Sequence, residues 1–320
     1  MPVGSAENGV GLWAGQIMLS ANYNYQYIDW SHDPVPGEDF DHIGNLVTNV
    51  LTPSITIGLS NYLNLTIKQA IGMRSMDWMG PENSAHHRDE TTLSSFNNAD
   101  GGVLGNTDVL LKYLFTNTGV GSGSRIFFGL GLTIPSKSVL TKSPYLKDDN
   151  EEALEDHRHF SLSDGCYKVN YELQYYIKGS PQVSFLPSFY GLTLNYFNPI
   201  DESKYGFKPG SSLVGIMSFL FTLNNKNLFY PKGLNVGLIY IKDEVSTWNG
   251  EKSPINSTIV FAPTLGINWT HDRMGSLNLN FRFMVNAPLQ SDKLNNKSNA
   301  MGISIGYRKI LDYSIPWLYW

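Results

Sequence analysis

The chain has 320 residues and a net charge of -5, so its composition gives no sign of a basic surface for nucleic acid. Its single cysteine, Cys166, cannot form an intrachain disulfide. Charged residues make up only 16% of the chain, against roughly 25% in soluble domains, whereas aromatic residues reach 13%. No apolar run reaches the roughly 18 residues that a transmembrane helix requires.

The first residues, MPVGSAENGVGLWAGQ, lack the charged start and the apolar core of a signal peptide. Because the pattern that follows requires export, we expect the printed sequence to be the mature form. We expect residues 1–13 to form a periplasmic or plug-forming segment. Residues 14–310 are predicted to form a single transmembrane β-barrel, and residues 311–320 a C-terminal tail.

Apolar and polar residues alternate with a period of two along most of the chain, which is typical of strands. No long segment fits a helical period better, so we predict an all-β chain of about twelve strands. The predicted strands are 14–30, 43–58, 63–79, 106–117, 124–136, 164–178, 182–197, 209–224, 233–245, 255–270, 275–289 and 298–310.

The connections between these strands mostly alternate in length. The connections at 60–64 and 117–124 are short, those at 80–105 and 137–163 are long and polar, and the one at 224–233 is intermediate. Tight periplasmic turns and longer extracellular loops are typical of outer-membrane barrels, and an even number of strands places both termini in the periplasm. The sequence therefore predicts a transmembrane antiparallel β-barrel in the bacterial outer membrane.

The segment LNLNFRFMVNAPLQ, residues 277–290, shows what the two faces of a strand contain. Successive side chains point to opposite faces, so one face is apolar and the other carries amides and a guanidinium. The predicted lipid-facing residues are Leu277, Leu279, Phe281, Phe283, Tyr171, Tyr175, Ile303 and Ile305. The predicted lumen-lining residues are Lys68, Arg74, Asp108, Lys112, Lys168, Glu172, Asn280, Arg282 and Arg308.

Two interpretations of the inward charges remain open. A basic excess attracts anions or the acid head of an amphipathic substrate, because a narrow pore with low-dielectric walls focuses the field. Alternatively, these residues form ion pairs and amide hydrogen bonds that fill a small barrel. Alternation is weak in 182–197 and 209–224, where LVGIMSFLF is apolar on both faces. This segment indicates either an apolar patch in the lumen or contact with a plug.

The long loops carry candidate metal ligands, each with a simpler alternative. The acidic run in 147–157 offers oxygen ligands for Ca²⁺, but it does not match an EF-hand and is otherwise a solvated loop. His86, His87, His157 and His159 lack a metal-binding spacing. Cys166, at a strand start, is expected to be a small packed residue. We predict no cofactor and no resident metal.

Four segments carry a resemblance to a known family. They are LGNTDVLLKYLF (104–115), FGLGLTIPS (128–136), LSDGCYKVNYELQYY (162–176) and FRFMVNAPLQ (281–290). In this order they resemble the outer-membrane transporter-like proteins called phenol-degradation meta-pathway components, which are related in architecture to the long-chain fatty-acid transporters. The resemblance implies a barrel of about twelve strands and a role in uptake of small hydrophobic compounds. Fatty-acid transporters have a longer N-terminal hatch, so inward-folded loops are a second candidate for a plug.

Three functions are weighed. The first is a channel or transporter for small hydrophobic or amphipathic molecules, and the second is a structural barrel that anchors or docks a partner complex. The third is a lipid hydrolase, since His159 and Ser161 resemble the His-x-Ser pair of outer-membrane phospholipase A, although Leu162 departs from that motif. We expect no enzyme activity. The expected partners are outer-membrane lipid and lipopolysaccharide, a small hydrophobic solute, and a protein at the loops or the periplasmic end.

Overall fold

The structure is a computed structural model that describes residues 11–34, 39–81, 88–118, 122–144, 157–179, 186–223, 227, 229–253, 257–286 and 297–318. Its strands are β1 (Gln16–His32), β2 (His42–Gly58), β3 (Leu63–Trp78), β4 (Glu90–Thr91), β5 (Leu104–Asn117), β6 (Gly123–Ile134), β7 (Lys168–Lys178), β8 (Phe189–Pro199), β9 (Phe207–Lys208), β10 (Ser212–Thr222), β11 (Gly233–Asp243), β12 (Thr247–Trp248), β13 (Glu251–Lys252), β14 (Thr258–His271), β15 (Gly275–Asn286) and β16 (Lys297–Ser314). The short 3-10 helix η2 (Pro316–Leu318) follows β16. None of the helical segments in these ranges is long and apolar enough to cross a membrane.

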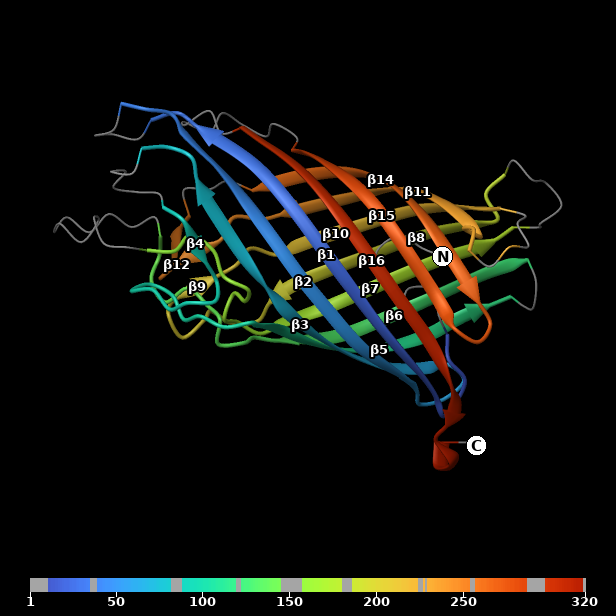
Figure 1. The fold of residues 1–320 in the computed structure, drawn as a ribbon. Coiled ribbons are helices and arrows are strands. Elements are labelled where there is room, and N and C mark those ends of the chain that lie inside the picture. Colours follow the sequence, from blue (N-terminus) through green and yellow to red (C-terminus); the bar gives the residue numbers. More distant parts are fainter. Residues whose placement is uncertain are drawn as a thin grey trace.

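Twelve long strands form a closed antiparallel barrel, which Figure 1 shows from the side. Each strand pairs with the next long strand along the chain, and the ring closes where β1 pairs with β16, with Tyr23 opposite Ile305. Closure matters because it leaves no strand edge without hydrogen-bond partners in a bilayer. The prediction of an all-β antiparallel barrel of about twelve strands is confirmed.

Most strand boundaries differ from the sequence prediction by three residues or fewer, and three differ by more. The final strand continues to Ser314, past the predicted end of the barrel at residue 310. The strand predicted from 164 begins at Lys168, because Gly165 has a φ of 76° and turns the chain. The strand predicted from 182 begins at Phe189, and residues 180–185 lie outside the described ranges.

The two ends of the barrel differ. At one end the connections 59–62 and 272–274 are short, and the chain termini meet there through a hydrogen bond from Ile315 N to Gly15 O of 2.8 Å. We call this the turn end. At the loop end the connections 79–103 and 135–167 are long, and the first of them contains β4. The strands β9, β12 and β13 form a small sheet in neighbouring loops. The structure shows these short strands in segments that the sequence predicted as loops.

The barrel wall has an apolar outer surface and a polar inner one. On β15, Phe281 is 42% exposed, whereas Asn280 beside it is only 3% exposed. On the inner side, the hydroxyls of Thr56 and Thr66 are hydrogen-bonded at 2.9 Å between β2 and β3. Apolar residues outside and hydrogen-bonded polar residues inside are the arrangement of a barrel that spans a bilayer.

The hydrogen-bond ladder of the wall is interrupted on both sides of β3 near Gln69 and Ala70. The amide nitrogen Nε2 of Gln69 donates to the carbonyl oxygens of Ala70 at 2.8 Å and Gly105 at 3.0 Å. Its Oε1 accepts from Thr107 Oγ1 at 2.5 Å. One side chain therefore satisfies two carbonyl groups at the interruption.

We predict that arginine is far more damaging at Ile305 than at the neighbouring Ser304. Ile305 is 42% exposed on the outer surface, whereas Ser304 lies opposite Asn24 and Asn280 on the inner side. Arginine facing the bilayer midplane costs about 2–4 kcal/mol. Equilibrium unfolding from lipid vesicles measures both variants, and equal losses for Ile305→Arg and Ser304→Arg would contradict the assignment of faces.

Replacing Gln69 by leucine should lower the free energy of unfolding by about 1–3 kcal/mol, because the carbonyl groups of Ala70 and Gly105 lose a donor away from water. Thr107→Val is the matched control, because it removes only the bond that Gln69 accepts. Unfolding in vesicles should rank Gln69→Leu as more harmful than Thr107→Val. The reverse ranking would show that the interruption does not depend on Gln69.

Candidate functional site

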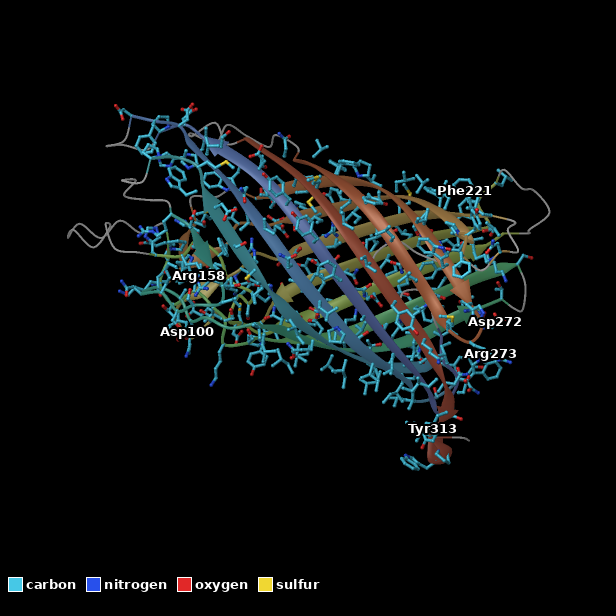
Figure 2. All side chains as sticks on the ribbon, in the orientation of Figure 1. Asp100, Arg158, Phe221, Asp272, Arg273 and Tyr313 are labelled. Atoms are coloured by element: carbon cyan, nitrogen blue, oxygen red, sulfur yellow. The ribbon has the colours of Figure 1, made fainter. Side chains whose placement is uncertain are left out.

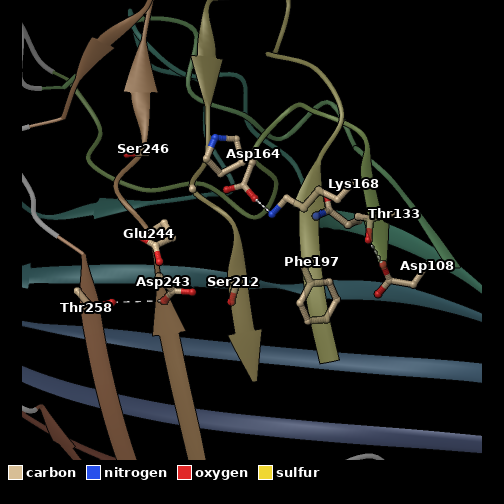
Figure 3. A pocket seen from close by; sticks show the side chains of 13 residues that line it. Asp108, Thr133, Asp164, Lys168, Phe197, Ser212, Asp243, Glu244, Ser246 and Thr258 are labelled. Atoms are coloured by element: carbon tan, nitrogen blue, oxygen red, sulfur yellow. Dashed lines mark hydrogen bonds and ion pairs between the residues drawn. The ribbon is translucent and has the colours of Figure 1, made fainter. Parts of the chain in front are cut away.

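A cavity of about 510 Å³ opens at the loop end of the lumen, and Figure 3 shows it from close by. We call it the vestibule. It is lined by Asn106, Asp108, Thr133, Asp164, Lys168, Phe197, Pro209, Gly210, Ser212, Asp243, Glu244, Ser246 and Thr258. These residues come from the loop ends of β5, β6, β7, β8, β10, β11 and β14 and from the adjoining loops. The size is that of a pocket for a small molecule.

Most charged groups of the vestibule are engaged within the protein. Asp108 accepts a hydrogen bond of 2.5 Å from Thr133 Oγ1, and Lys168 is ion-paired with Asp164 (Figure 3). Glu244 is ion-paired with Lys242 at 2.7 Å. Asp243 accepts a hydrogen bond from Thr258 Oγ1 at 3.4 Å. The lining therefore carries more carboxylates than cations, and two of the carboxylates are held in ion pairs.

Deeper in the lumen, apolar residues follow one another across the strands. We call them the apolar row: Met76, Leu46, Ile28, Ala300, Met284, Ala262, Ile239 and Ile216 on β3, β2, β1, β16, β15, β14, β11 and β10. Successive members are cross-strand partners, except Ala262 and Met284, which flank the interruption of the β14–β15 ladder at Pro263. All belong to the inner side of their strands.

The apolar row descends through the lumen. Met76 lies near the loop end of β3, which ends at Trp78. From Ile216 the same line of cross-strand partners runs through Thr193 and Gln174 to Phe127 and Leu114, near the turn end of β5 and β6. The strands run diagonally in Figure 1, so a line of partners across them winds around the barrel as it descends.

The segment 209–224, apolar on both faces in the sequence, contributes to this row. Its inner side carries Val214, Ile216 and Leu220, while Met217 and Phe219 point outward. Val214 and Ile216 lie opposite Ile241 and Ile239 on β11. Of the two interpretations left open, an apolar patch in the lumen agrees with these positions.

At the turn end, the lumen contains a buried apolar cluster of Leu114, Phe127 and Tyr176, with Phe189 packed against it. The N-terminal segment reaches this cluster, because a side-chain carbon on Gly11 would lie 3.5 Å from Phe127 Cε1. Residues 1–10 lie outside the described ranges. Gly11 of the expected N-terminal segment therefore lies beside side chains of the lumen.

The predicted lumen residues share the inner side but differ in their surroundings. Lys112 is buried, with its ammonium 5.4 Å from the centre of the Phe127 ring. Arg74 donates from Nη1 to the carbonyl of Ser161 at 3.3 Å. The others are Lys68, Asp108, Lys168, Glu172, Asn280, Arg282 and Arg308, on β3, β5, β7, β15 and β16. The structure does not bring them into one cluster.

The predicted lipid-facing residues lie on the opposite side of the strands. Tyr171, Tyr175, Leu277, Phe281, Phe283 and Ile305 are each at least one third exposed, and Leu279 and Ile303 are partly exposed. Tyr171 stacks on Tyr196 of the next strand with ring centres 6.3 Å apart.

A packed region covers the loop end; we call residues 88–103, 135–144, 157–167 and 200–211 the loop cap. Its centre is the fully buried Arg158, whose backbone exchanges two hydrogen bonds with the Asn98 side chain, at 2.7 and 2.8 Å. Arg158 Nη1 donates to the Thr91 carbonyl at 2.8 Å. Figure 2 shows Arg158 and Asp100 at this end, with Asp272 and Arg273 at the opposite one. Neither Arg158 nor Asn98 could be recognised from the sequence, because each occurs in an unremarkable polar loop.

Glu90 is the buried acid of the loop cap. Both of its carboxylate oxygens accept from His159 N, the closer at 3.1 Å. Burial raises the pKa of Glu90 to about 7, although His159 N, Arg158, Arg88 and Arg74 oppose the shift. Glu90 lies in a loop strand, so it is outside the membrane-spanning strands.

The other loop candidates do not assemble into a catalytic or metal site in the described ranges. Ser161 Oγ donates to the Ser163 carbonyl at 2.6 Å rather than to His159. Among the described residues, no group of three or more His, Cys, Asp or Glu side chains is placed to hold a metal. Most of the acidic run 147–157, together with His86 and His87, lies outside these ranges. Cys166 is buried, and burial raises the pKa of its thiol to about 12.

Comparisons with known proteins support the fold. No model of a known protein family and no curated protein matches the sequence. The crystal structure of an outer membrane channel from Pseudomonas putida F1 aligns with a TM-score of 0.60 and 13% identity, covering 94% of this chain and 97% of that one. The CymD monoaromatic hydrocarbon channel has a TM-score of 0.43 and 8% identity over 98% and 94% of the two chains. The P. putida toluene transporter TodX has a TM-score of 0.39 and 9% identity over 94% and 91%.

We predict that the loop cap is less stable at alkaline than at acidic pH. The pKa of Glu90 rises from 4.5 to about 7 in the folded cap, so folding favours the protonated acid. This stabilisation is complete below about pH 4.5 and is lost as the pH rises through 7, with an upper limit of about 3 kcal/mol. Hydrogen-exchange protection of the His159 amide should therefore fall over this range.

Glu90→Gln is the matched control, because glutamine keeps an acceptor for His159 N but does not titrate. Its protection should be nearly independent of pH after correction for intrinsic exchange. A native cap whose protection rises with pH would contradict the role of Glu90.

Proposed function

We propose that the protein is an outer-membrane channel for small hydrophobic or amphipathic molecules, with the loop end outside the cell and the turn end in the periplasm. The observation that carries this proposal is the apolar row, which begins near the loop cap and extends across eight strands to Ile216. Its line of cross-strand partners continues through Thr193 and Gln174 to the cluster of Leu114 and Phe127. A barrel that serves only as a scaffold has no need of apolar side chains in a water-accessible lumen. The similar outer membrane channel from Pseudomonas putida F1 supports the same class of function.

The vestibule is the proposed entrance. It lies at the loop end and presents Phe197 among hydroxyl, amide and carboxylate groups. A pocket with apolar surface and a few polar groups suits a small amphipathic molecule. From there, Ser212 is two residues from Val214 on the inner side of β10, so the vestibule adjoins the apolar patch.

The alternative of a structural barrel that docks a partner rests on the polar part of the lumen. Its lower half contains hydrogen bonds such as Ser20–Ser54 at 2.5 Å and Asn280–Asn278 at 3.2 Å. Such ladders also support the wall of a channel, so they favour neither function by themselves. The apolar row favours the channel.

Polar substitutions within the apolar row should slow uptake of a hydrophobic solute several-fold, because a buried amide without partners costs free energy in an apolar path. The test variant is Ile28→Asn with Leu46→Asn, two partners in the row. The control is Gln26→Asn with Thr48→Asn, one step lower on the same strands. Uptake of N-phenyl-1-naphthylamine by bacteria that express each variant is the measurement.

Equal uptake by the two double variants would contradict a role for the apolar row. Uptake no faster than in cells without the protein would contradict the channel itself. Heat-modifiable electrophoretic mobility should first show that each variant forms a folded barrel.

A further inference from the structure

Arg282 differs from the other cations that line the lumen. Arg74 donates to Ser161 O, Lys168 pairs with Asp164, and Lys112 lies over the Phe127 ring. Lys68 and Arg308 also have interactions within the protein. Within the described ranges, Arg282 has no hydrogen-bond acceptor and no ion-pair partner, and its Nε is buried without one.

The surroundings of Arg282 explain why it has no neutralising partner in the described part of the chain. Its cross-strand neighbours are Thr264 on β14 and Gly302 on β16. The side chain lies over Gly302, where an added side-chain carbon would be 2.5 Å from Arg282 Nε. Asn280 and Met284 flank it on the inner side of β15. None of these neighbours is an acid.

An uncompensated guanidinium inside a membrane barrel is costly, and such groups commonly mark the path of a solute. Arginine offers a planar set of donors that matches a carboxylate. The side chain is partly exposed, so it is accessible from the lumen. The missing partner is therefore best supplied by an anion that enters the lumen.

The position of Arg282 relative to the apolar row indicates the rest of the ligand. Met284, a member of the row, is two residues away on the same face of β15, a spacing of roughly 6.6 Å along a strand. Ala300 lies opposite Met284. A molecule whose carboxylate reaches Arg282 therefore places its next few carbons over Met284 and Ala300.

We propose that Arg282 is a binding site for the carboxylate of small apolar acids, with the apolar body of the ligand along Met284 and Ala300. This inference rests on the proposed channel function and narrows it to monocarboxylic acids with a compact aromatic or short aliphatic body. Two of the four vestibule carboxylates, Asp164 and Glu244, are ion-paired, whereas Asp108 and Asp243 accept hydrogen bonds from threonine hydroxyls.

The test compares 4-fluorobenzoate with 4-fluorobenzyl alcohol, which share a body and differ in charge. Fluorine NMR titration of the purified barrel measures both affinities. The native protein should bind the acid roughly tenfold more tightly than the alcohol, the usual contribution of a hydrogen-bonded charge. The Arg282→Met variant should bind the acid no more tightly than the native protein binds the alcohol. The Arg282→Lys variant should keep part of the preference for the acid.

Arg308→Met is the matched control, because Arg308 has an interaction within the protein and lies on β16, six residues beyond Gly302. It should keep the preference for the acid. Loss of the preference in Arg308→Met but not in Arg282→Met would overturn the assignment, as would a native protein that binds both probes equally.

These measurements distinguish failure of the carboxylate site at Arg282 from failure of the proposed channel function. If the native protein binds and takes up the alcohol but shows no preference for the acid, only the role of Arg282 is wrong. If it neither binds nor takes up either probe, the proposed channel function is wrong as well.

Discussion

The structure depends on one requirement: every backbone N–H and C=O group needs a hydrogen-bond partner where water is absent. Strands can do so in a bilayer only by closing into a ring, and here the ring closes between β1 and β16. Where the ladder is interrupted on both sides of β3, the Gln69 side chain donates to two carbonyl groups. Even a local departure from the ladder thus obeys the same requirement.

Closure also fixes the register between strands, and the register decides which inner side chains become neighbours. Residues far apart in the chain, such as Met284, Ala300 and Ile28, form a continuous apolar surface only because the pairing brings them into line. The same register sets Arg282 opposite Gly302 and Thr264, with no acid beside it. The electrostatic character of the lumen is therefore a property of the pairing as much as of the residues.

The fold could be predicted from the sequence because its signal is local. Apolar and polar side chains alternate along a strand, as Phe281 and Arg282 do, and this pattern can be read without knowledge of distant contacts. The same is true of loop length. The apolar row and the isolation of Arg282 could not be predicted, since both require the register between strands. The loop cap was also missed, because Glu90 and Arg158 are 68 positions apart in the chain and meet only in the folded structure. The predicted start of β7 was wrong because a single residue, Gly165, turns the chain just before the strand.

The diagonal course of the strands gives the apolar row the geometry of a screw thread. A solute that keeps contact with it turns about the barrel axis as it advances. The line of the apolar row depends on the register of every strand in the ring. Inserting two residues into one strand preserves which side chains face inward, but it shifts the register of that strand against its neighbours by two residues. Such an insertion leaves the barrel closed but breaks the alignment of the apolar side chains at that strand.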